Sequence, residues 1–271
     1  MSETGPAQLQ GLKPQSSSAR HDLTCRLRGP CPASYLRQSL DANAAMLARG
    51  VNADFVDLGE QLAGGGQTSL IVDPANGRIP ARTKMGMMRQ KTLGMPDGAR
   101  SADNPEDRAL SARCIVVEAS PILPTATGYN NNVQIFQTPD HVVILQEMTH
   151  EASIVPLDGR PRLATQIPQW RGSARGHWEG DTLVVETTNV HPQRTIFGSG
   201  PEVRITERYT RTDDGTLRYG FTIDDPASFA SPWRAAFPLS RRDEPVYEFA
   251  CHEGNRSMAL ILEVARAQDG N

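Results

Sequence analysis

The sequence predicts a mainly β protein whose antiparallel strands form one meander. Two observations lead to this fold class. About eight short segments of strand-forming residues follow one another in the second half of the chain, and turn-forming Gly, Asp and Pro residues separate them. Such a meander closes into a barrel or folds as a sandwich. The chain of 271 residues is long enough to bury a sizeable core, and we expect one domain overall.

The N-terminal part is expected to be irregular at first and then helical. Residues 1–33 are polar and are predicted to form an irregular or disordered leader. A helix is predicted from Ser34, a good N-cap residue, to Ala48. Residues 34–114 as a whole are expected to form a helical and loop segment that packs on the β region. The apolar face of the predicted helix consists of Leu36, Leu40, Ala44 and Leu47.

Three shorter elements follow within residues 34–114. Thr68 to Val72 is predicted to be a strand, because a run of Asp, Pro, Asn and Gly typical of a turn follows it. Ile79 to Gly98 is predicted to be helical in part. Asn104 followed by Pro105 is typical of a helix start, and this helix is expected to run to Cys114. The methionines Met85, Met87, Met88 and Met95 are expected to fill the core or cover an opening.

Residues 115–271 are predicted to form the antiparallel barrel, followed by a C-terminal helix. Alternation is clearest in one hairpin, whose first strand places Val203, Ile205, Glu207 and Tyr209 on one face. Its second strand places Leu217, Tyr219, Phe221 and Ile223 on one face. The helix is expected from about Arg256 to Gln268, capped by Asn255, with an apolar stripe of Met258, Ile261, Leu262 and Ala265. The predicted strands are Val133 to Phe136, Val142 to Met148, Ser153 to Leu157, Thr182 to Thr188, Val203 to Arg211, Leu217 to Ile223, Trp233 to Leu239 and Val246 to His252.

Composition excludes several classes of partner. The net charge of -3 predicts no broad attraction to nucleic acid. The sequence has no run of the ~18 apolar residues that a membrane helix requires, so no integral membrane segment is expected. Met1 to Arg20 lacks the apolar stretch of a signal peptide. A periplasmic or secreted location and a cytoplasmic one both stay open, as does assembly into a homo-oligomer.

The four cysteines allow two interpretations. Cys25 with Cys31 and Cys114 with Cys251 would form two disulfides in an exported protein. Four reduced thiols in a cytosolic protein are the alternative.

The strongest acid–base candidates are two histidines with neighbouring glutamates. Glu147 and His150 have the spacing of half of a zinc-protease helix motif, but Gln146 stands where that motif has its first histidine. In a regular strand the two side chains would point to opposite faces, which disfavours a metal site. A strand-end ion pair with Arg160 or Arg162 is the alternative.

His252 and Glu253 form the second candidate pair, where the last predicted strand meets the last helix. Histidine titrates near neutral pH, so His252 would be able to transfer protons with Glu253 as its partner. The alternative is structural, with Gly254 in a tight turn and His252 bonded to backbone.

Other polar and aromatic side chains would bind a substrate. Tyr129 and Asn131 offer a phenol and an amide, and Arg160 would steady a developing negative charge. The alternative for Asp224, with its neighbour Asp225, is an Asx turn. The alternative for the tryptophans is core packing. The predicted pocket lining is Tyr129, Asn131, Trp170, Trp178, Trp233 and Asp224.

Gly176 to Asn189 and Tyr247 to Asn255 resemble a large group of mostly uncharacterised bacterial proteins, many of which carry export signals. Tyr129 to Asn132 and Pro156 to Pro161 match as well, and the resemblance covers roughly residues 55–268. Members often have His where this chain has Gln146, which argues against an obligate metal there. The resemblance implies a lipocalin-like barrel that holds apolar ligands, but no particular activity.

We therefore expect a cofactor-independent enzyme that uses acid–base chemistry on a hydrophobic, aromatic or terpenoid-like small molecule in a barrel pocket. It would be a lyase, an isomerase or a hydrolase, because His, Glu, Asp and Trp residues gather at strand ends without any cofactor motif. The absence of nucleophile-elbow, P-loop and dinucleotide motifs disfavours the common hydrolase, ATPase and dehydrogenase classes. His150 or His252 would be the acid or base. A lipocalin-like carrier without turnover and a metal-dependent hydrolase are the alternatives.

Overall fold

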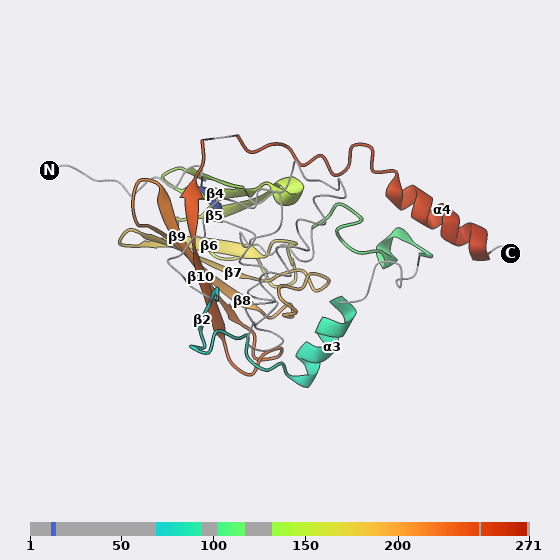
Figure 1. The fold of residues 1–271 in the computed structure, drawn as a ribbon, viewed down its shortest axis with the longest axis horizontal. Coiled ribbons are helices and arrows are strands. Elements are labelled where there is room, and N and C mark those ends of the chain that lie inside the picture. The colour runs from blue at the N-terminus through green and yellow to red at the C-terminus, as the bar shows by residue number, and fades with distance from the viewer. Residues whose placement is uncertain (1–11, 15–68, 94–101, 117–131, 244, 270–271) are drawn as a thin grey trace, which may run out of the picture.

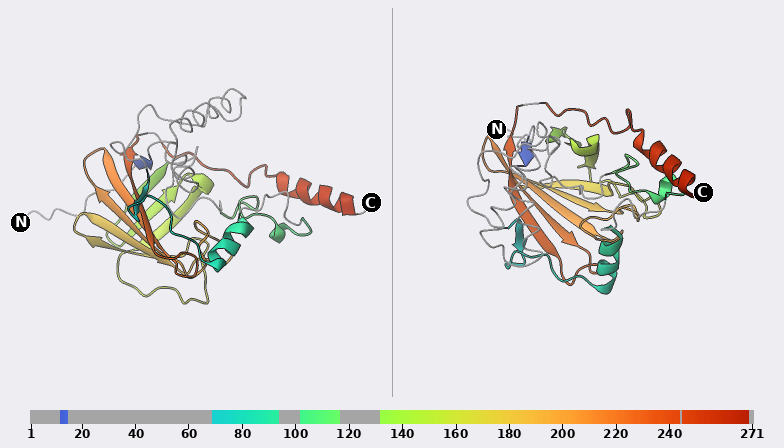
Figure 2. Two further views of the ribbon diagram at one scale, coloured as in Figure 1. Left: turned by 60° about the horizontal axis from the view of Figure 1, so that its bottom comes forward. Right: turned by 45° about the vertical axis from the view of Figure 1, so that its right-hand side comes forward.

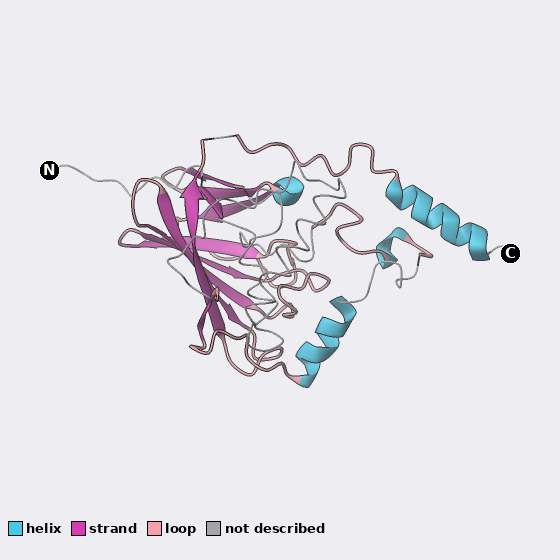
Figure 3. Ribbon diagram, viewed as in Figure 1, coloured by secondary structure: helices cyan, strands magenta, loops and turns pink. Residues whose placement is uncertain are grey.

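The computed structural model describes residues 12–14, 69–93, 102–116, 132–243 and 245–269 (Figure 1). Strands dominate this part of the chain (Figure 3), so the prediction of a mainly β fold is confirmed. The helix predicted from Ser34 to Ala48 lies outside the described residues, as does nearly all of the leader at 1–33.

The strands follow one antiparallel, hydrogen-bonded order, β5-β4-β3-β1-β10-β9-β8-β7-β6, and β2 also pairs with β10. Because β2 belongs to the segment 34–114, this segment contributes a strand to the sheet as well as packing on it. The strands are β1 (Leu12–Pro14), β2 (Ile71–Asp73), β3 (Val133–Gln137), β4 (His141–Gln146), β5 (Glu151–Pro156), β6 (Ser173–Glu179), β7 (Thr182–Thr188), β8 (Arg204–Arg211), β9 (Thr216–Asp224) and β10 (Trp233–Arg241).

The predicted barrel is not confirmed, because the hydrogen-bonded order does not close. β3, β4 and β5 form one antiparallel group, β6 to β10 form another, and the short β1 joins them. The strands at the two ends of the order, β5 and β6, meet through side chains instead of a backbone ladder. A Cβ atom on Gly176 of β6 would lie 2.8 Å from side-chain atoms of both Val155 and Leu157. Glycine therefore lets the apolar side chains of this edge approach the β6 backbone.

Adding a methyl group at Gly176 should loosen this junction between β5 and β6. Gly176→Ala is expected to lower the free energy of unfolding by about 1–3 kcal/mol, because the site is already closely packed. The matched control is Gly215→Ala, since a Cβ atom there would meet only Asp213 Oδ1, at 3.7 Å. Urea denaturation of both variants measures the difference. Equal free energies of unfolding in the two variants would show that close packing at Gly176 does not contribute to stability.

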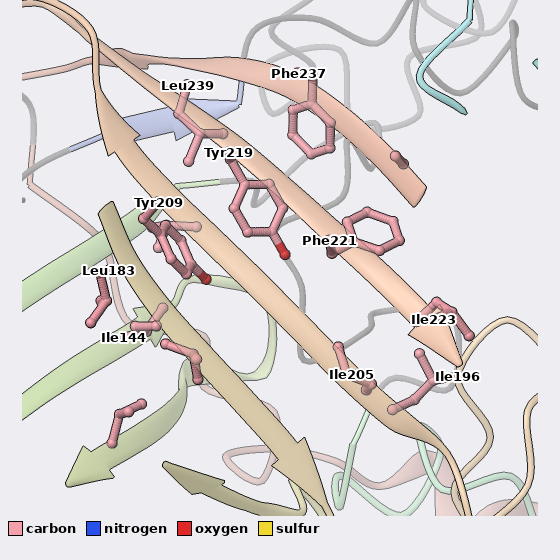
Figure 4. Close-up of a cluster of buried hydrophobic side chains, with 14 of the residues drawn as sticks. Ile144, Leu183, Ile196, Ile205, Tyr209, Tyr219, Phe221, Ile223, Phe237 and Leu239 are labelled. Carbon is pink, nitrogen blue, oxygen red and sulfur yellow. The ribbon is translucent and has the colours of Figure 1, made fainter. Parts of the chain in front are cut away.

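The core lies on the inward face of the strands, and the β8–β9 hairpin confirms the predicted alternation. Ile205 pairs with Ile223, and Tyr209 pairs with Tyr219, so their side chains project together into the core (Figure 4). The predicted inward residues of both strands are all buried, including Glu207. Buried aromatic side chains from β9 and β10 continue this layer: Tyr219, Phe221, Trp233 and Phe237.

The sequence analysis missed one strand and predicted one that does not form. β6 was not predicted, because Ser173–Glu179 combines glycine with charged residues, and its extended form depends on pairing with β7. Val246 to His252 was predicted as a strand but has no regular structure. The chain leaves the sheet after Arg241 because β10 already pairs with β9 on one side and with β1 and β2 on the other.

The helices agree with the sequence in part. α4 (Ser257–Asp269) has the predicted stripe, in which Leu262 is buried, and the helix extends away from the strands (Figure 2). The helix predicted to run to Cys114 is a single 3-10 turn, η3 (Pro105–Asp107), and Arg108 after it is already extended. No helix in the described ranges combines the length and apolar character that crossing a membrane requires.

α3 (Lys84–Leu93) forms within the segment that was predicted to be partly helical, and the Arg89 side chain attaches it to the loop after β9. Arg89 donates a 2.8 Å hydrogen bond to Ser228 Oγ and lies 3.6 Å from the Asp225 carboxylate. The expectation that the methionines fill the core was wrong for Met85, Met87 and Met88, because all three are exposed. Met95 lies outside the described residues.

A disulfide joins Cys114 to Cys251, so the predicted pairing of these two cysteines is confirmed. The cross-link spans a sequence separation of 137 residues and ties the segment after η3 to the segment before α4. Asn255 was predicted to cap α4, but its amide donates to the backbone oxygen of Ala112 at 3.3 Å. Cys25 and Cys31 lie outside the described residues.

Candidate functional site

A carboxylic acid with two phenols forms the most unusual polar group of the core. Glu207 lies on β8, two residues before Tyr209, and Tyr219 lies on the paired strand β9. Tyr209 donates a 2.6 Å hydrogen bond to Glu207 Oε1, and Tyr219 donates a 3.0 Å bond to the same atom. Figure 4 shows both phenols on one face of the two strands. The exposed fraction is 1% for Glu207 and 0% for each tyrosine.

The two oxygens of this carboxyl group have different surroundings. Oε1 accepts both tyrosine hydrogen bonds, whereas no described residue donates one to Oε2. A carboxylate has lone pairs for about four hydrogen bonds, so Oε2 keeps capacity for a proton or for a donor on a bound molecule. The two phenols therefore orient the carboxyl group through Oε1 and leave Oε2 able to accept a proton or a hydrogen bond.

Burial sets the charge state of this group. Desolvation raises the pKa of Glu207 to about 7, although the hydrogen bonds from Tyr209 and Tyr219 and the positive charge of Arg171 act to lower it. Burial and the nearby Glu207 carboxyl also raise the pKa of both tyrosines well above the ordinary value. The phenols thus stay protonated donors at neutral pH, while the titration of the acid is shifted toward neutral pH.

Arg171, whose positive charge acts on Glu207, belongs to a group of arginine and carboxylate side chains. Arg171 forms an ion pair with Glu151 and donates a 2.8 Å hydrogen bond to Ser153 Oγ. The side chains of Arg171 and Glu151 are 13% and 12% exposed, so they reach solvent. Arg194, which is fully buried, lies 3.7 Å from Glu151 and donates a 2.8 Å bond to the Trp170 carbonyl.

Burial lowers the pKa of Arg194 to about 10, and the neighbouring Glu151 partly offsets this effect. The guanidinium therefore stays charged at neutral pH. Positive charge near Glu207 favours the ionised form of that acid. The charge of Arg171 therefore links the buried acid to a group of charged side chains that reaches solvent.

The structure does not bring the predicted histidine–glutamate pairs together as acid–base groups. Glu147 is buried, and its Oε2 accepts hydrogen bonds from the backbone and side chain of Asn132 at 3.1 and 2.7 Å. His150 is exposed at the end of the 3-10 helix η4 (Met148–His150), where its φ angle is 51°. The predicted continuation of β4 to Met148 stops because this turn interrupts the strand.

His252 and Glu253 are exposed side chains in the turn that precedes α4. The backbone oxygen of His252 accepts a 3.2 Å hydrogen bond from Asn255, and Gly254 has a φ angle of 70°. This geometry fits the structural alternative of a tight turn. Both candidate histidines therefore lie on the surface, outside the enclosed core that contains Glu207.

Arg160 is also held at the surface. Its Nε donates a 2.7 Å hydrogen bond to Asp158, two residues earlier. Arg162 instead pairs with Glu186 at 3.0 Å, so neither arginine forms the ion pair that was considered for Glu147 and His150. Arg160 thus stabilises the turn after β5.

The predicted pocket-lining residues have several different environments. Trp233 is buried, Trp178 packs against the core, and Trp170 stacks on His191 with ring centroids 3.8 Å apart. Asp224 is half-buried at the end of β9. The Asx turn forms at Asp225, whose Oδ1 accepts a 3.1 Å hydrogen bond from the backbone of Ala227. Tyr129 and Asn131 lie outside the described residues.

The motif at Gly176 to Asn189 forms the β6–β7 hairpin. Gly180, with a φ angle of 58°, occupies its turn. On the exposed side His177 lies 3.2 Å from Glu179, which also pairs with Arg208 of β8. This part of the motif stabilises the surface of the sheet, and the glycine at 176 permits the packing of β5.

Glu207 was not selected from the sequence, although a signal was present. It occupies an inward position in the clearest alternating strand, where an apolar residue is normal. Ionisable residues buried in this way are often functional. The grouping of Glu151, Arg171 and Arg194 had no comparable signal, because these residues come from strand β5 and from two separate loops.

The described residues contain no group of three or more His, Cys, Asp or Glu side chains that would hold a metal ion. No family model matches the chain, and no match was found among curated proteins or solved structures.

Proposed function

We propose that this protein is a cofactor-independent enzyme that transfers a proton on a hydrophobic small molecule, with Glu207 as the acid–base group. The observation that supports this proposal is the arrangement at Glu207. Its Oε1 is held by two phenols, while Oε2 accepts no hydrogen bond from a described residue. Burial also brings its pKa to about 7, where one carboxyl group serves as both base and acid.

The proposed step begins with the ionised form of Glu207. Oε2 takes a proton from an acidic C–H or O–H bond, and the electron pair of that bond moves into the substrate. The protonated acid then returns the proton to another atom, or to a leaving group. Tyr209 and Tyr219 keep the carboxyl orientation fixed, because both donate to Oε1. These two tyrosines are positioning residues. Proton transfer of this kind is used by isomerases, lyases and hydrolases.

A general probe for such a base is 5-nitrobenzisoxazole, which is flat and apolar. A base removes its ring proton, the C–H electron pair forms the nitrile, and the N–O bond breaks to release a coloured phenolate. The full chain is expected to accelerate this elimination, with a rate that rises as pH increases through about 7. Glu207→Gln should reduce the rate by about 10²- to 10⁴-fold, the usual contribution of a general base.

The matched controls are His150→Ala and His252→Ala, which remove the exposed histidines. Both variants are expected to keep the wild-type rate and pH profile. Tyr219→Phe removes one hydrogen bond to Oε1, so it should move the midpoint of the pH profile upward. Wild-type rates in Glu207→Gln, or loss of rate in a histidine variant, would contradict the role of Glu207.

A carrier without turnover is the second candidate, and the enclosure of the site favours it. Glu207, Tyr209 and Tyr219 expose at most 1% of their surface, which is typical of groups that anchor a ligand or complete a core. This function predicts binding of 5-nitrobenzisoxazole without release of phenolate. Calorimetry alongside the rate measurement therefore separates the carrier from the enzyme.

A further inference from the structure

The core next to Glu207 continues as an aromatic layer that leads to the loop between β7 and β8. Phe221 pairs directly with Glu207 across the β8–β9 ladder, so the two side chains are neighbours on the inward face. Phe221 and Trp233 have ring centroids 5.7 Å apart, and Phe229 and Trp233 have centroids 6.0 Å apart. Phe221, Phe229 and Trp233 are called the aromatic box below.

Phe197 from the loop between β7 and β8 places its ring against two of these side chains. Its ring stacks on Phe221 with centroids 5.7 Å apart, and meets Trp233 edge-on at 5.2 Å. Phe197 is half-buried and has a φ angle of 54°, a conformation that is costly for a bulky residue. Gly198 follows with a φ angle of 81°, which glycine adopts easily. The ring of Phe197 is therefore held by a loop whose backbone would gain by relaxing.

Three buried hydrogen-bond groups without partners among the described residues belong to Trp233, which contacts this ring, to Ser199 in the same loop, and to Arg82, which bonds to the Phe197 backbone. Trp233 and Ser199 are only 1% and 0% exposed, and neither Trp233 Nε1 nor Ser199 Oγ has a hydrogen-bond partner among the described residues. Arg82 Nη1 likewise has no partner in the described part of the chain, whereas its Nη2 donates a 2.8 Å bond to the Phe197 carbonyl. The Arg82 guanidinium lies 4.8 Å above the Phe229 ring. An N–H group left unpaired in a core costs about 1–3 kcal/mol, so each such donor favours an acceptor on a bound molecule.

We propose that the aromatic box binds an aromatic ring that carries a carbonyl oxygen, and that the Phe197 ring occupies this position when no ligand is bound. The ligand oxygen would accept hydrogen bonds from Arg82 Nη1 and Trp233 Nε1. This inference rests on the proposed function, because it names the substrate class of the site that contains Glu207. The direct pairing of Phe221 with Glu207 places the ring beside the acid.

Acetophenone and ethylbenzene test this proposal, since they differ mainly by the carbonyl oxygen. In titrations of the full chain followed by NMR, acetophenone is expected to bind about tenfold more tightly, the effect of one good hydrogen bond. Arg82→Met should remove this preference and leave ethylbenzene binding unchanged. Arg160→Met, a change of an exposed arginine, is the matched control and should keep the preference. Phe197→Ala should tighten binding of both compounds by about tenfold, because it removes the competing ring.

A second measurement reads ligand binding directly on the wild-type protein. The indole N–H resonance of Trp233, assigned by its loss in Trp233→Phe, should move downfield on addition of acetophenone but not of ethylbenzene. Equal affinities for the two compounds, or an unmoved Trp233 resonance at saturation, would overturn the proposal. Glu207→Gln is expected to keep acetophenone binding. If that variant binds acetophenone and wild type fails to convert 5-nitrobenzisoxazole, the proton-transfer function fails and the ring site stands. If the wild type converts 5-nitrobenzisoxazole but binds acetophenone and ethylbenzene with equal affinity, only the ring site is rejected.

Discussion

Raising the pH from 5 to 8 should lower the unfolding free energy of the wild type by about 2–3 kcal/mol more than that of Glu207→Gln. The cause is the buried acid, whose pKa is about 7 in the folded protein and 4.5 as its ordinary value. Between these two values the folded state holds the proton more tightly than the unfolded chain. The stabilisation from protonated Glu207 is therefore complete at low pH and is lost as pH rises to about 7.

Urea denaturation of both proteins at several pH values measures this difference. Glutamine keeps the size of the side chain and an acceptor oxygen for the two tyrosines, but it does not titrate. Glu263→Gln on the exposed side of α4 is the matched control and should show the wild-type dependence. If the unfolding free energies of the wild type and Glu207→Gln change in parallel from pH 5 to 8, the pKa of Glu207 is not raised in the folded protein.

Replacing both cysteines of the Cys114–Cys251 disulfide with serine should lower the free energy of unfolding by about 2–5 kcal/mol. The cross-link spans a sequence separation of 137 residues, so its loss gives the unfolded chain much conformational freedom. It also releases the attachment between the segment after η3 and the segment before α4. The effect should be largest in hydrogen exchange of α4, which extends away from the strands (Figure 2).

Reduction of the wild type supplies an independent comparison. A thiol reductant should lower wild-type stability toward that of the double serine variant, because both proteins then lack the Cys114–Cys251 cross-link. Exchange rates in β8 and β9 should change little under native conditions, because these strands are stabilised by the core. Unchanged stability in the double variant would show that packing alone holds the two segments together.

Local pattern was sufficient for the elements whose stability depends on their own alternation. The hairpin of β8 and β9, strand β7 at Thr182–Thr188 and helix α4 were all predicted within a few residues. Each has apolar residues at the spacing that one buried face requires. The mainly β class followed from the same signal.

Elements that depend on a partner were decided only by the tertiary structure. β6 is extended because β7 pairs with it, whereas Val246 to His252 follows β10, both of whose edges are already paired. The junction between β5 and β6, where no backbone ladder forms, likewise depends on how the apolar side chain of Val155 packs against Gly176. None of these outcomes follows from the local sequence, because each depends on residues far away in the chain.

The candidate site shows the same division. The sequence by itself determined that Glu207 faces the core, because the alternation of its strand leaves no other position. Only the tertiary structure decided that Tyr219 of β9 joins Tyr209 in binding its Oε1 and that the positive charge of Arg171 acts on it, since Tyr219 and Arg171 come from another strand and a distant loop. The histidines attracted attention for their chemistry alone. Their exposure depends on where the chain turns, and composition does not encode this.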